Sequence, residues 1–95
     1  MKIVSSARAS REQIHNFDYL FSRSPKTARR FSQAVKTTLQ QLSEHPESGQ
    51  SFDGSAKRVI PLNGFPFLIY YRIDRDTLTI LSIFHTAQDP ARQPD

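Results

Sequence analysis

The chain of 95 residues contains no cysteine and no tryptophan, and it has only three glycines. The lack of cysteine excludes disulfide bonds, thiolate metal ligands and a cysteine nucleophile, and it suits a reducing compartment. No glycine-rich run is present that could cradle a phosphate group. No stretch reaches the roughly eighteen apolar residues of a membrane span, and the N-terminus lacks the apolar segment of a signal peptide. We therefore expect a cytoplasmic protein without a membrane partner.

Basic residues outnumber acidic residues in the composition. Thirteen Lys and Arg stand against nine Asp and Glu, which gives a formal net charge of +4 and a pI near 9.9. This balance favours an acidic or polyanionic partner, although a solvated basic surface explains it equally well. The length fits one compact domain over residues 1–95, with 86–95 as a C-terminal tail.

Two amphipathic helices are predicted in the N-terminal half. A short extended segment at 2–5 precedes a helix over about 7–22, whose apolar residues recur at three- and four-residue steps. Ser24 and Pro25 form the next helix start, because serine caps the first N–H groups and proline is tolerated in a first turn. This second helix ends before Pro46, since the residue preceding a proline is pushed out of the α region. The short connection at 22–24 makes the two helices an antiparallel hairpin.

The apolar periodicity changes to two in the C-terminal half, which predicts β-strands. Three such segments, at 58–62, 67–73 and 77–85, are rich in Ile, Leu, Phe, Tyr and Thr. Their connections are too short for a crossover helix, so the strands form an antiparallel meander. Residues 50–56 are expected to be a loop. The predicted fold class is α+β, a short N-terminal strand and an antiparallel helical hairpin packed on an antiparallel sheet, in the order β-α-α-β-β-β.

Both faces of the last predicted strand are largely apolar. One face of the sheet takes the helices, and the other would be an exposed apolar patch unless something covers it. This second face is a candidate binding surface, with the C-terminal tail or a second copy of the chain as alternative covers. Strict alternation would place the following side chains on opposite faces: Leu78, Ile80, Ser82 and Phe84 on one, and Thr79, Leu81, Ile83 and His85 on the other.

Of the three histidines, only His85 lies at the end of a predicted strand, where a side chain keeps a fixed position. His15, on the polar side of the first helix, and His45, beside a helix-ending proline, are typical of surface residues. No pair has recognisable metal-ligand spacing, so no metal and no cofactor is expected. RNA cleavage needs only a base, an acid and cations, and His85, Arg58 and Arg72 could converge on one sheet surface for it. The alternative is a strand-end histidine and two edge arginines that protect the sheet from aggregation.

Five short segments follow one another in an order and spacing typical of one protein family: PESG at 46–49, RVIPL at 58–62, FPFLIYYRI at 65–73, ILSIFH at 80–85 and DP at 89–90. Together with the two preceding helices, they resemble the ParE/RelE superfamily of toxins from type II toxin–antitoxin systems, and within it the ParE-like branch. The superfamily has a helical hairpin on an antiparallel sheet, which agrees with the architecture expected from periodicity.

The resemblance implies a toxin held inactive by a cognate antitoxin, whose extended or helical segment folds onto the toxin and fills its apolar grooves. We expect the antitoxin to contact the second sheet face through Leu68, Tyr70, Leu81 and Ile83 and to form a hetero-oligomer with the toxin. Operator DNA would be bound only through the antitoxin. ParE-like members are associated with poisoning DNA gyrase, and RelE-like members with cutting mRNA on the ribosome. Because both activities share one fold, the fold cannot choose between them.

One strand position favours gyrase as the target. RelE-like ribonucleases carry an arginine early in the strand that here reads FLIY, where this chain has Leu68. We therefore expect a non-enzymatic inhibitor whose target contacts are Arg58, Arg72, His85 and, in the tail, Arg92. The alternatives are a ribosome-dependent mRNA endoribonuclease, with His85, Arg58 and Arg72 as catalytic candidates, and a non-toxic member that keeps only antitoxin binding. The proline-broken tail is too short for a long terminal helix.

Overall fold

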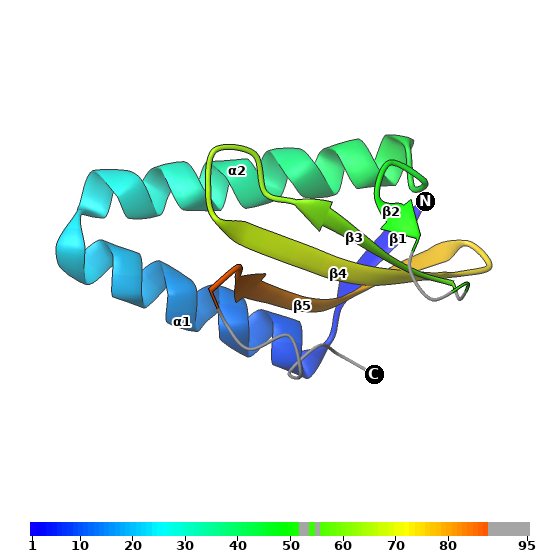
Figure 1. Cartoon of the computed structure of the whole chain (residues 1–95), viewed down its shortest axis with the longest axis horizontal. Coiled ribbons are helices and arrows are strands. Elements are labelled where there is room, and N and C mark those ends of the chain that lie inside the picture. The colour runs from blue at the N-terminus through cyan, green and yellow to red at the C-terminus, as the bar shows by residue number, and fades with distance from the viewer. Residues whose placement is uncertain (52–53, 55, 88–95) are drawn as a thin grey trace.

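The computed structural model describes residues 1–51, 54 and 56–87, and in these residues a helical hairpin covers one face of a five-stranded sheet (Figure 1). The predicted α+β fold is confirmed. The strands lie in the order β1-β5-β4-β3-β2. In chain order the elements are β1 (Lys2–Ser5), α1 (Ala7–Arg23), α2 (Pro25–Glu44), β2 (Gln50–Ser51), β3 (Lys57–Pro61), β4 (Phe67–Asp74) and β5 (Thr77–His85).

A single residue, Ser24, separates the two helices and serves both of them. Its backbone N–H donates to the Leu20 carbonyl and closes α1, and its hydroxyl accepts from the Thr27 N–H at 3.3 Å and starts α2. Pro25 takes the first position of α2, where its missing N–H costs no hydrogen bond. The predicted helix start at Ser24 and Pro25 is confirmed, and the connection is shorter than expected.

The sheet differs from the predicted meander at both of its edges. β1 pairs with β5 in parallel, with Ile3 opposite Leu78, so the sheet is mixed rather than purely antiparallel. The expectation of a loop over 50–56 was wrong at its start, because β2 pairs antiparallel with β3 through Gln50 and Ser51. A two-residue strand carries no readable periodicity, and a parallel edge strand is fixed by long-range pairing rather than by local sequence.

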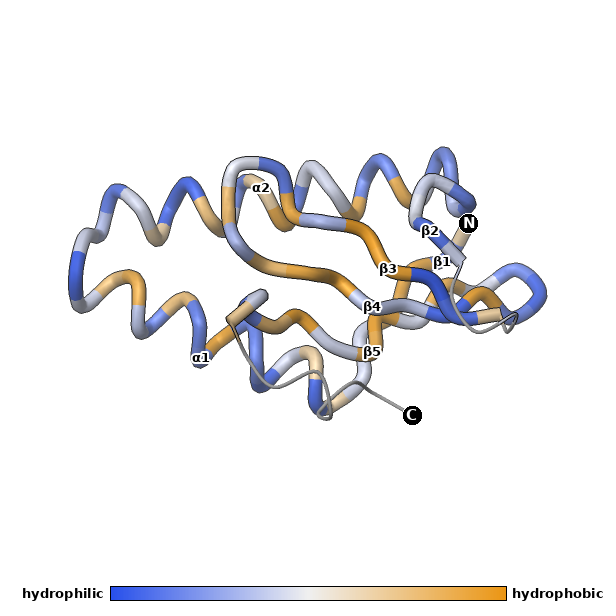
Figure 2. Tube along the Cα trace, in the orientation of Figure 1, coloured by the Kyte–Doolittle hydropathy of each residue, from blue (hydrophilic) through white to orange (hydrophobic). Residues whose placement is uncertain are grey.

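The core lies between the helices and the sheet. The tube coloured by hydropathy shows the apolar stretches of β3, β4 and β5, which in this view run between the two helices (Figure 2). Phe31 stands at its centre and contacts two rings, Phe65 at 5.8 Å and Phe67 at 5.1 Å between centroids. The buried cluster consists of one residue from α1, three from α2 and eight from the sheet side: Ala9, Phe31, Val35, Leu42, Ile60, Leu62, Phe67, Ile69, Tyr71, Leu78, Ile80 and Ile83.

A network around Tyr71 holds the turn that follows α2. The buried Tyr71 hydroxyl donates to the Pro46 carbonyl and accepts from the Gly49 N–H, both at 2.8 Å. Arg58, opposite Tyr71 on β3, donates to the Gly49 carbonyl at 2.8 Å and to the Glu47 carbonyl at 3.4 Å. Position 49 has no room for a side chain, since an added Cβ would lie 2.7 Å from the Tyr71 Cε1 atom. The PESG segment is therefore a tether between α2 and the sheet.

Replacing Tyr71 by Phe is expected to lower the free energy of unfolding by about 1–3 kcal/mol, because the Gly49 N–H and the Pro46 carbonyl lose their buried partner. Burial raises the Tyr71 pKa above its ordinary value of 10.0. The group therefore stabilises the fold fully below about pH 10, and this contribution is lost as the pH rises towards the folded pKa. Urea unfolding measured from neutral to alkaline pH checks both effects.

The same alkaline titration contains its own control in Tyr70, the preceding residue on β4, whose pKa is also raised by burial. Tyr71→Phe should remove part of the alkaline fall in stability and leave the part due to Tyr70. An unchanged alkaline fall in Tyr71→Phe would contradict the assignment.

A β-bulge changes the side-chain alternation on β5. Tyr70 pairs with Ser82 and Tyr71 with Ile80, so Leu81 is an extra residue between the two pairs. The predicted strict alternation over 77–85 was wrong beyond this point. Ile83 was expected on the face opposite to Leu78 and Ile80, but it lies in the core with both of them. A bulge reverses the facing of every later residue in a strand, and nothing in the local sequence marks it.

Helix α1 closes the edge of β5 where β1 ends. β1 pairs with β5 only as far as Ile80. Beyond it, the Glu12 carboxylate accepts from the Ser82 hydroxyl at 2.7 Å and from the Ile83 N–H at 3.2 Å. Asn16 donates to the Ile83 carbonyl at 3.2 Å. Side chains of the helix thus take the place of a neighbouring strand, which keeps this edge from pairing with another chain.

Candidate functional site

The three residues expected to form one site, Arg58, Arg72 and His85, do not come together. Arg58 pairs with Tyr71 of β4, and His85 pairs with Phe67 of β4. Because these two β4 residues are four positions apart, Arg58 and His85 are separated by about 13 Å along the strand direction. Arg72 follows Tyr71 and therefore points to the other face of the sheet from Arg58. The predicted convergence of these three side chains on one surface was wrong.

Each of the two arginines has a different environment. Arg58 is half-buried, and its guanidinium is engaged by the carbonyls of Glu47 and Gly49. Arg72 is exposed on the outer face, opposite Lys57 on β3 and Thr79 on β5. Arg58 is therefore part of the tether around Tyr71, while Arg72 is available to a partner.

His85 has a fixed ring at the end of β5. Its imidazole meets the Phe67 ring edge to face, with the centroids 5.2 Å apart and the planes at 81°. Its Nδ1 atom accepts a hydrogen bond from the Ala87 N–H at 3.0 Å, so in this arrangement the proton of the neutral ring belongs to Nε2. The Thr86 N–H donates to the Pro66 carbonyl at 2.8 Å and keeps the chain after β5 against the loop before β4.

A cleft of about 450 Å³ opens beside His85, between α1 and the loop that precedes β4. Phe65 and Phe67 give it an apolar wall, and His15 and Tyr19 come from α1. Arg23 lies over the Tyr19 ring at 5.0 Å from its centroid. The complete lining is His15, Asn16, Tyr19, Leu20, Phe65, Pro66, Phe67, His85 and Ala87. Such a cleft can receive an apolar or aromatic side chain and orient it by the polar groups at its rim.

The sequence interpretation missed the α1 side of this cleft. His15 was interpreted as a surface residue, and it is exposed, but it lines the cleft together with Tyr19 one turn further on. Tyr19 is 54% exposed, which is unusual for a large ring in a helix that packs on a sheet. The spacing of four residues between the two rings puts them on one face of the helix and was the available signal.

The four residues predicted to contact an antitoxin have unequal access to solvent. Leu68 and Leu81 are half-buried, and Tyr70 is only 5% exposed, with its ring 5.0 Å from that of Phe84. Ile83 is fully enclosed in the core. Arg92, the fourth predicted target contact, lies outside the described residues. The outer sheet face is thus less open than its apolar sequence suggested.

Among the described residues, no group of three or more His, Asp or Glu side chains is placed to hold a metal ion. In the same part of the chain, no helix is both long enough and apolar enough to cross a membrane.

Comparison with known proteins settles the family. The model of the family described as the ParE toxin of the type II toxin–antitoxin system parDE matches residues 3–90. The chain belongs to the ParE toxin family. It is also 33% identical to a protein of Sinorhizobium fredii named "Putative toxin Y4kP" over 70 residues, which cover 74% of this chain and 72% of that protein. The resemblance inferred from the five sequence segments is confirmed.

A solved structure shares the fold of this ParE-family chain. A chain from the chromosomal ParDE toxin–antitoxin system of P. aeruginosa superposes with a TM-score of 0.75 at 19% sequence identity. The match covers 90% of this chain and 95% of the other. The two chains therefore share the two-layer architecture although few of their residues are identical.

Proposed function

We propose that this ParE-type toxin acts by binding and poisoning DNA gyrase, not by cutting RNA. The observation that supports this is the separation of Arg58, Arg72 and His85, since acid–base cleavage needs its groups within hydrogen-bond reach of one reacting phosphate. A fixed histidine in an apolar cleft is better suited to recognising a protein surface. Gyrase is the target associated with the ParE branch, and the toxin would meet it in the cytoplasm.

The cleft beside His85 is our candidate for the main target contact. Phe65 and Phe67 would receive an aromatic or aliphatic side chain of the target, and His15 and His85 would orient it at the rim. The exposed Arg72 and, in the tail, Arg92 are proposed as additional contacts. Arg58 contributes indirectly, by holding the carbonyls of the PESG tether.

A cognate antitoxin is proposed to neutralise the toxin by covering the outer sheet face. Leu68 and Leu81 still have accessible surface there, beside the paired rings of Tyr70 and Phe84. Ile83 would contribute only by supporting the bulge from the core side. The two chains would form a hetero-oligomer. Sequence-specific reading of operator DNA is assigned to the antitoxin.

The deciding experiment adds the purified toxin to two assays in parallel, DNA supercoiling by gyrase and translation of a reporter mRNA by ribosomes. We expect inhibited supercoiling with trapped DNA breaks, intact mRNA, and recovery of supercoiling when the antitoxin is added. His85→Gln should weaken the inhibition, whereas His45→Gln, at the far end of α2, should not.

Two other outcomes would each overturn this proposal in a recognisable way. Cut mRNA with unaffected gyrase would make the chain a ribonuclease and would require Arg72 and His85 to be brought together on the ribosome. No effect in either assay, together with normal growth on expression without the antitoxin, would mark a non-toxic member that only binds antitoxin.

A further inference from the structure

The positive charge of this chain is concentrated in one acid-free segment. Residues 19–43 contain five Lys and Arg and no Asp or Glu. The whole chain has a net charge of +4, so the remainder of the sequence is close to neutral. The five cations, which follow one another through the helical hairpin, are Arg23, Lys26, Arg29, Arg30 and Lys36.

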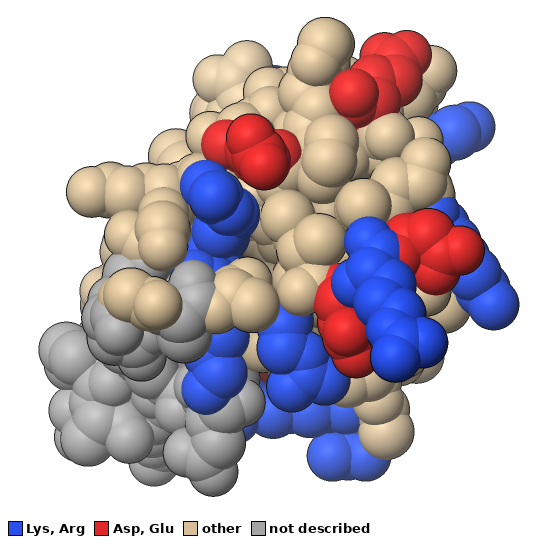
Figure 3. Space-filling view, turned by 90° about the vertical axis from the view of Figure 1, so that its right-hand side faces the viewer, with Lys and Arg blue, Asp and Glu red and all other residues tan. Residues whose placement is uncertain are grey.

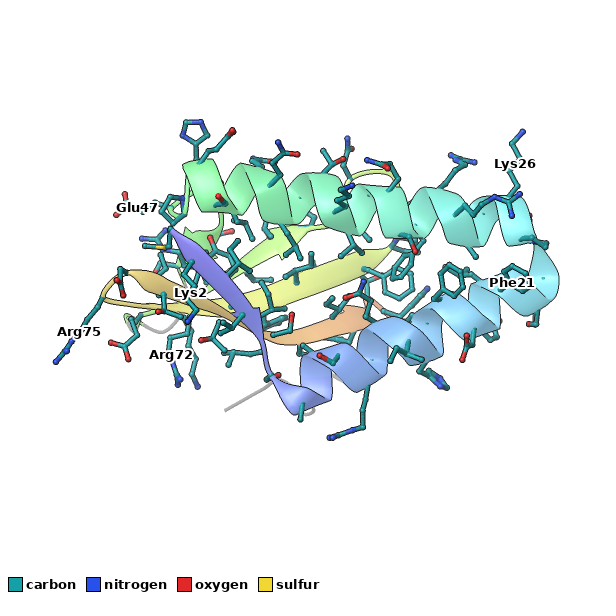
Figure 4. The ribbon with its side chains drawn as sticks, turned by 180° about the vertical axis from the view of Figure 1, so that it is seen from behind. Lys2, Phe21, Lys26, Glu47, Arg72 and Arg75 are labelled. Atoms are coloured by element: carbon teal, nitrogen blue, oxygen red, sulfur yellow. The ribbon has the colours of Figure 1, made fainter. Side chains whose placement is uncertain are left out.

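The fold presents four of these cations on the outer surface of α2, and the fifth, Arg23, is the last residue of α1. The inward side of α2 is buried through Ala28, Phe31, Val35, Thr38 and Leu42, while all five cations are exposed. From Lys26 to Lys36 the row is about 15 Å long at the rise of a helix. Figure 4 shows Lys26 at the tip of the hairpin, pointing away from the body of the molecule.

The opposite end of the molecule has a different charge pattern. There, Figure 3 shows acidic side chains beside the basic ones. Arg75, at the tip of the β4–β5 turn, stands between Asp74 and Asp76 in the sequence. Along α2, by contrast, no ion pair involves its four cations in the part of the chain that the structure describes. Their charge is therefore available to an external anion.

The chemistry of the outer α2 surface distinguishes between kinds of partner. A protein interface has an apolar or aromatic centre. Outer α2 has none, because the large exposed apolar side chains among the described residues are Met1, Ile14, Tyr19 and Phe21, and all of these precede α2. After Pro25 in the first turn, its neutral exposed residues are hydrogen-bonding ones: Gln33, Thr37, Gln40 and Gln41. Cations mixed with amide and hydroxyl groups are the typical contacts to phosphate and sugar.

We propose that the outer face of α2 binds the phosphate backbone of double-stranded DNA without reading its sequence. This contact is separate from the cleft beside His85 and from operator recognition by an antitoxin, and it does not depend on gyrase being the target. Where gyrase is the target, the face would hold the toxin on the DNA that the enzyme carries.

The test measures binding of the purified chain to a short fluorescent DNA duplex by anisotropy over a range of salt concentrations. The test variant is Lys26→Gln/Arg29→Gln/Arg30→Gln, and the matched control is Lys2→Gln/Arg11→Gln/Arg75→Gln, which removes the same charge from other exposed positions. Glutamine keeps the helix propensity of lysine and arginine, so α2 should remain folded. Circular dichroism and urea unfolding of both variants verify this.

We expect micromolar binding at low salt, a loss of at least about tenfold in the α2 variant, and a change within about twofold in the control. The slope of log K against log salt should become shallower by about 2.7 in the α2 variant, since each lost phosphate contact removes about 0.9. Equal losses in the two variants would mean that net charge alone binds DNA, and this would overturn the proposal.

Competition with two other polyanions, duplex RNA and poly-glutamate, tests whether the surface prefers duplex DNA. Duplex RNA that binds tenfold more tightly than duplex DNA would overturn the assignment to DNA. Poly-glutamate that competes as well as DNA of equal charge would show that the surface takes acidic protein segments instead. Gyrase inhibition measured on the same preparations separates this result from the proposed function, since DNA binding can fail while inhibition remains.

Discussion

Replacing Phe31 by Ala is expected to lower the free energy of unfolding by about 3–5 kcal/mol, which is a large part of the total stability of a domain this size. The Phe31 ring is fully buried and contacts Phe65 at 5.8 Å and Phe67 at 5.1 Å between centroids. The same two rings form the apolar wall of the cleft beside His85. The substitution should therefore weaken target binding as well as the fold. Urea unfolding and the supercoiling assay measure the two losses.

Phe31→Leu provides the matched control, because leucine keeps most of the buried volume but supplies no ring for Phe65 and Phe67 to contact. It should cost less than half as much stability as Phe31→Ala. If Phe31→Leu unfolds as readily as Phe31→Ala, the aromatic contacts rather than the filled volume hold this region. A Phe31→Ala chain as stable as the parent would contradict the placement of Phe31 at the centre of the core.

The helices and the three longer strands could be predicted from the sequence because each carries a local signal that tertiary contacts do not override. Ser24 with Pro25 marks a helix start, and Pro46 marks a helix end, whatever lies around them. Alternating apolar residues mark a strand that is buried on one side. The core positions on α2, including Phe31, Val35 and Leu42, follow from the spacing of three and four residues.

The features that were missed depend on contacts between distant segments. The parallel pairing of β1 with β5 joins residues about 75 positions apart, and the bulge at Leu81 is set by how β4 and β5 fit together. The separation of Arg58, Arg72 and His85 follows from the same register. A cleft shared by α1 and the loop before β4 could not be located before the packing of the helix was known. The prediction that His85 lies at the end of a strand was thus correct, but the prediction that Arg58 and Arg72 lie beside it was wrong.

Replacing Glu12 by Ala is expected to destabilise the chain by about 2–4 kcal/mol and to cause association at high concentration. The Ser82 hydroxyl is fully buried, and both it and the Ile83 N–H donate to the Glu12 carboxylate. Without that acceptor, two donors are left unsatisfied, at about 1–3 kcal/mol each when buried. The edge of β5 beyond Ile80 also loses its cover and can pair with another chain. Urea unfolding and light scattering over a concentration series measure the two effects.

Glu12→Gln isolates the hydrogen bonds from the charge. The amide oxygen of glutamine can accept from Ser82 and Ile83, while the ion pair with Arg8, 3.6 Å away and partly exposed, is lost. Since exposed ion pairs contribute about 0–1 kcal/mol, Glu12→Gln should remain close to the parent in stability and associate no more than the parent does. If Glu12→Gln associates as Glu12→Ala does, the charge of Glu12 and not its role as an edge acceptor keeps the chains apart. Because the edge lies next to the bulge at Leu81, its closure also protects the sheet surface that we propose for antitoxin binding.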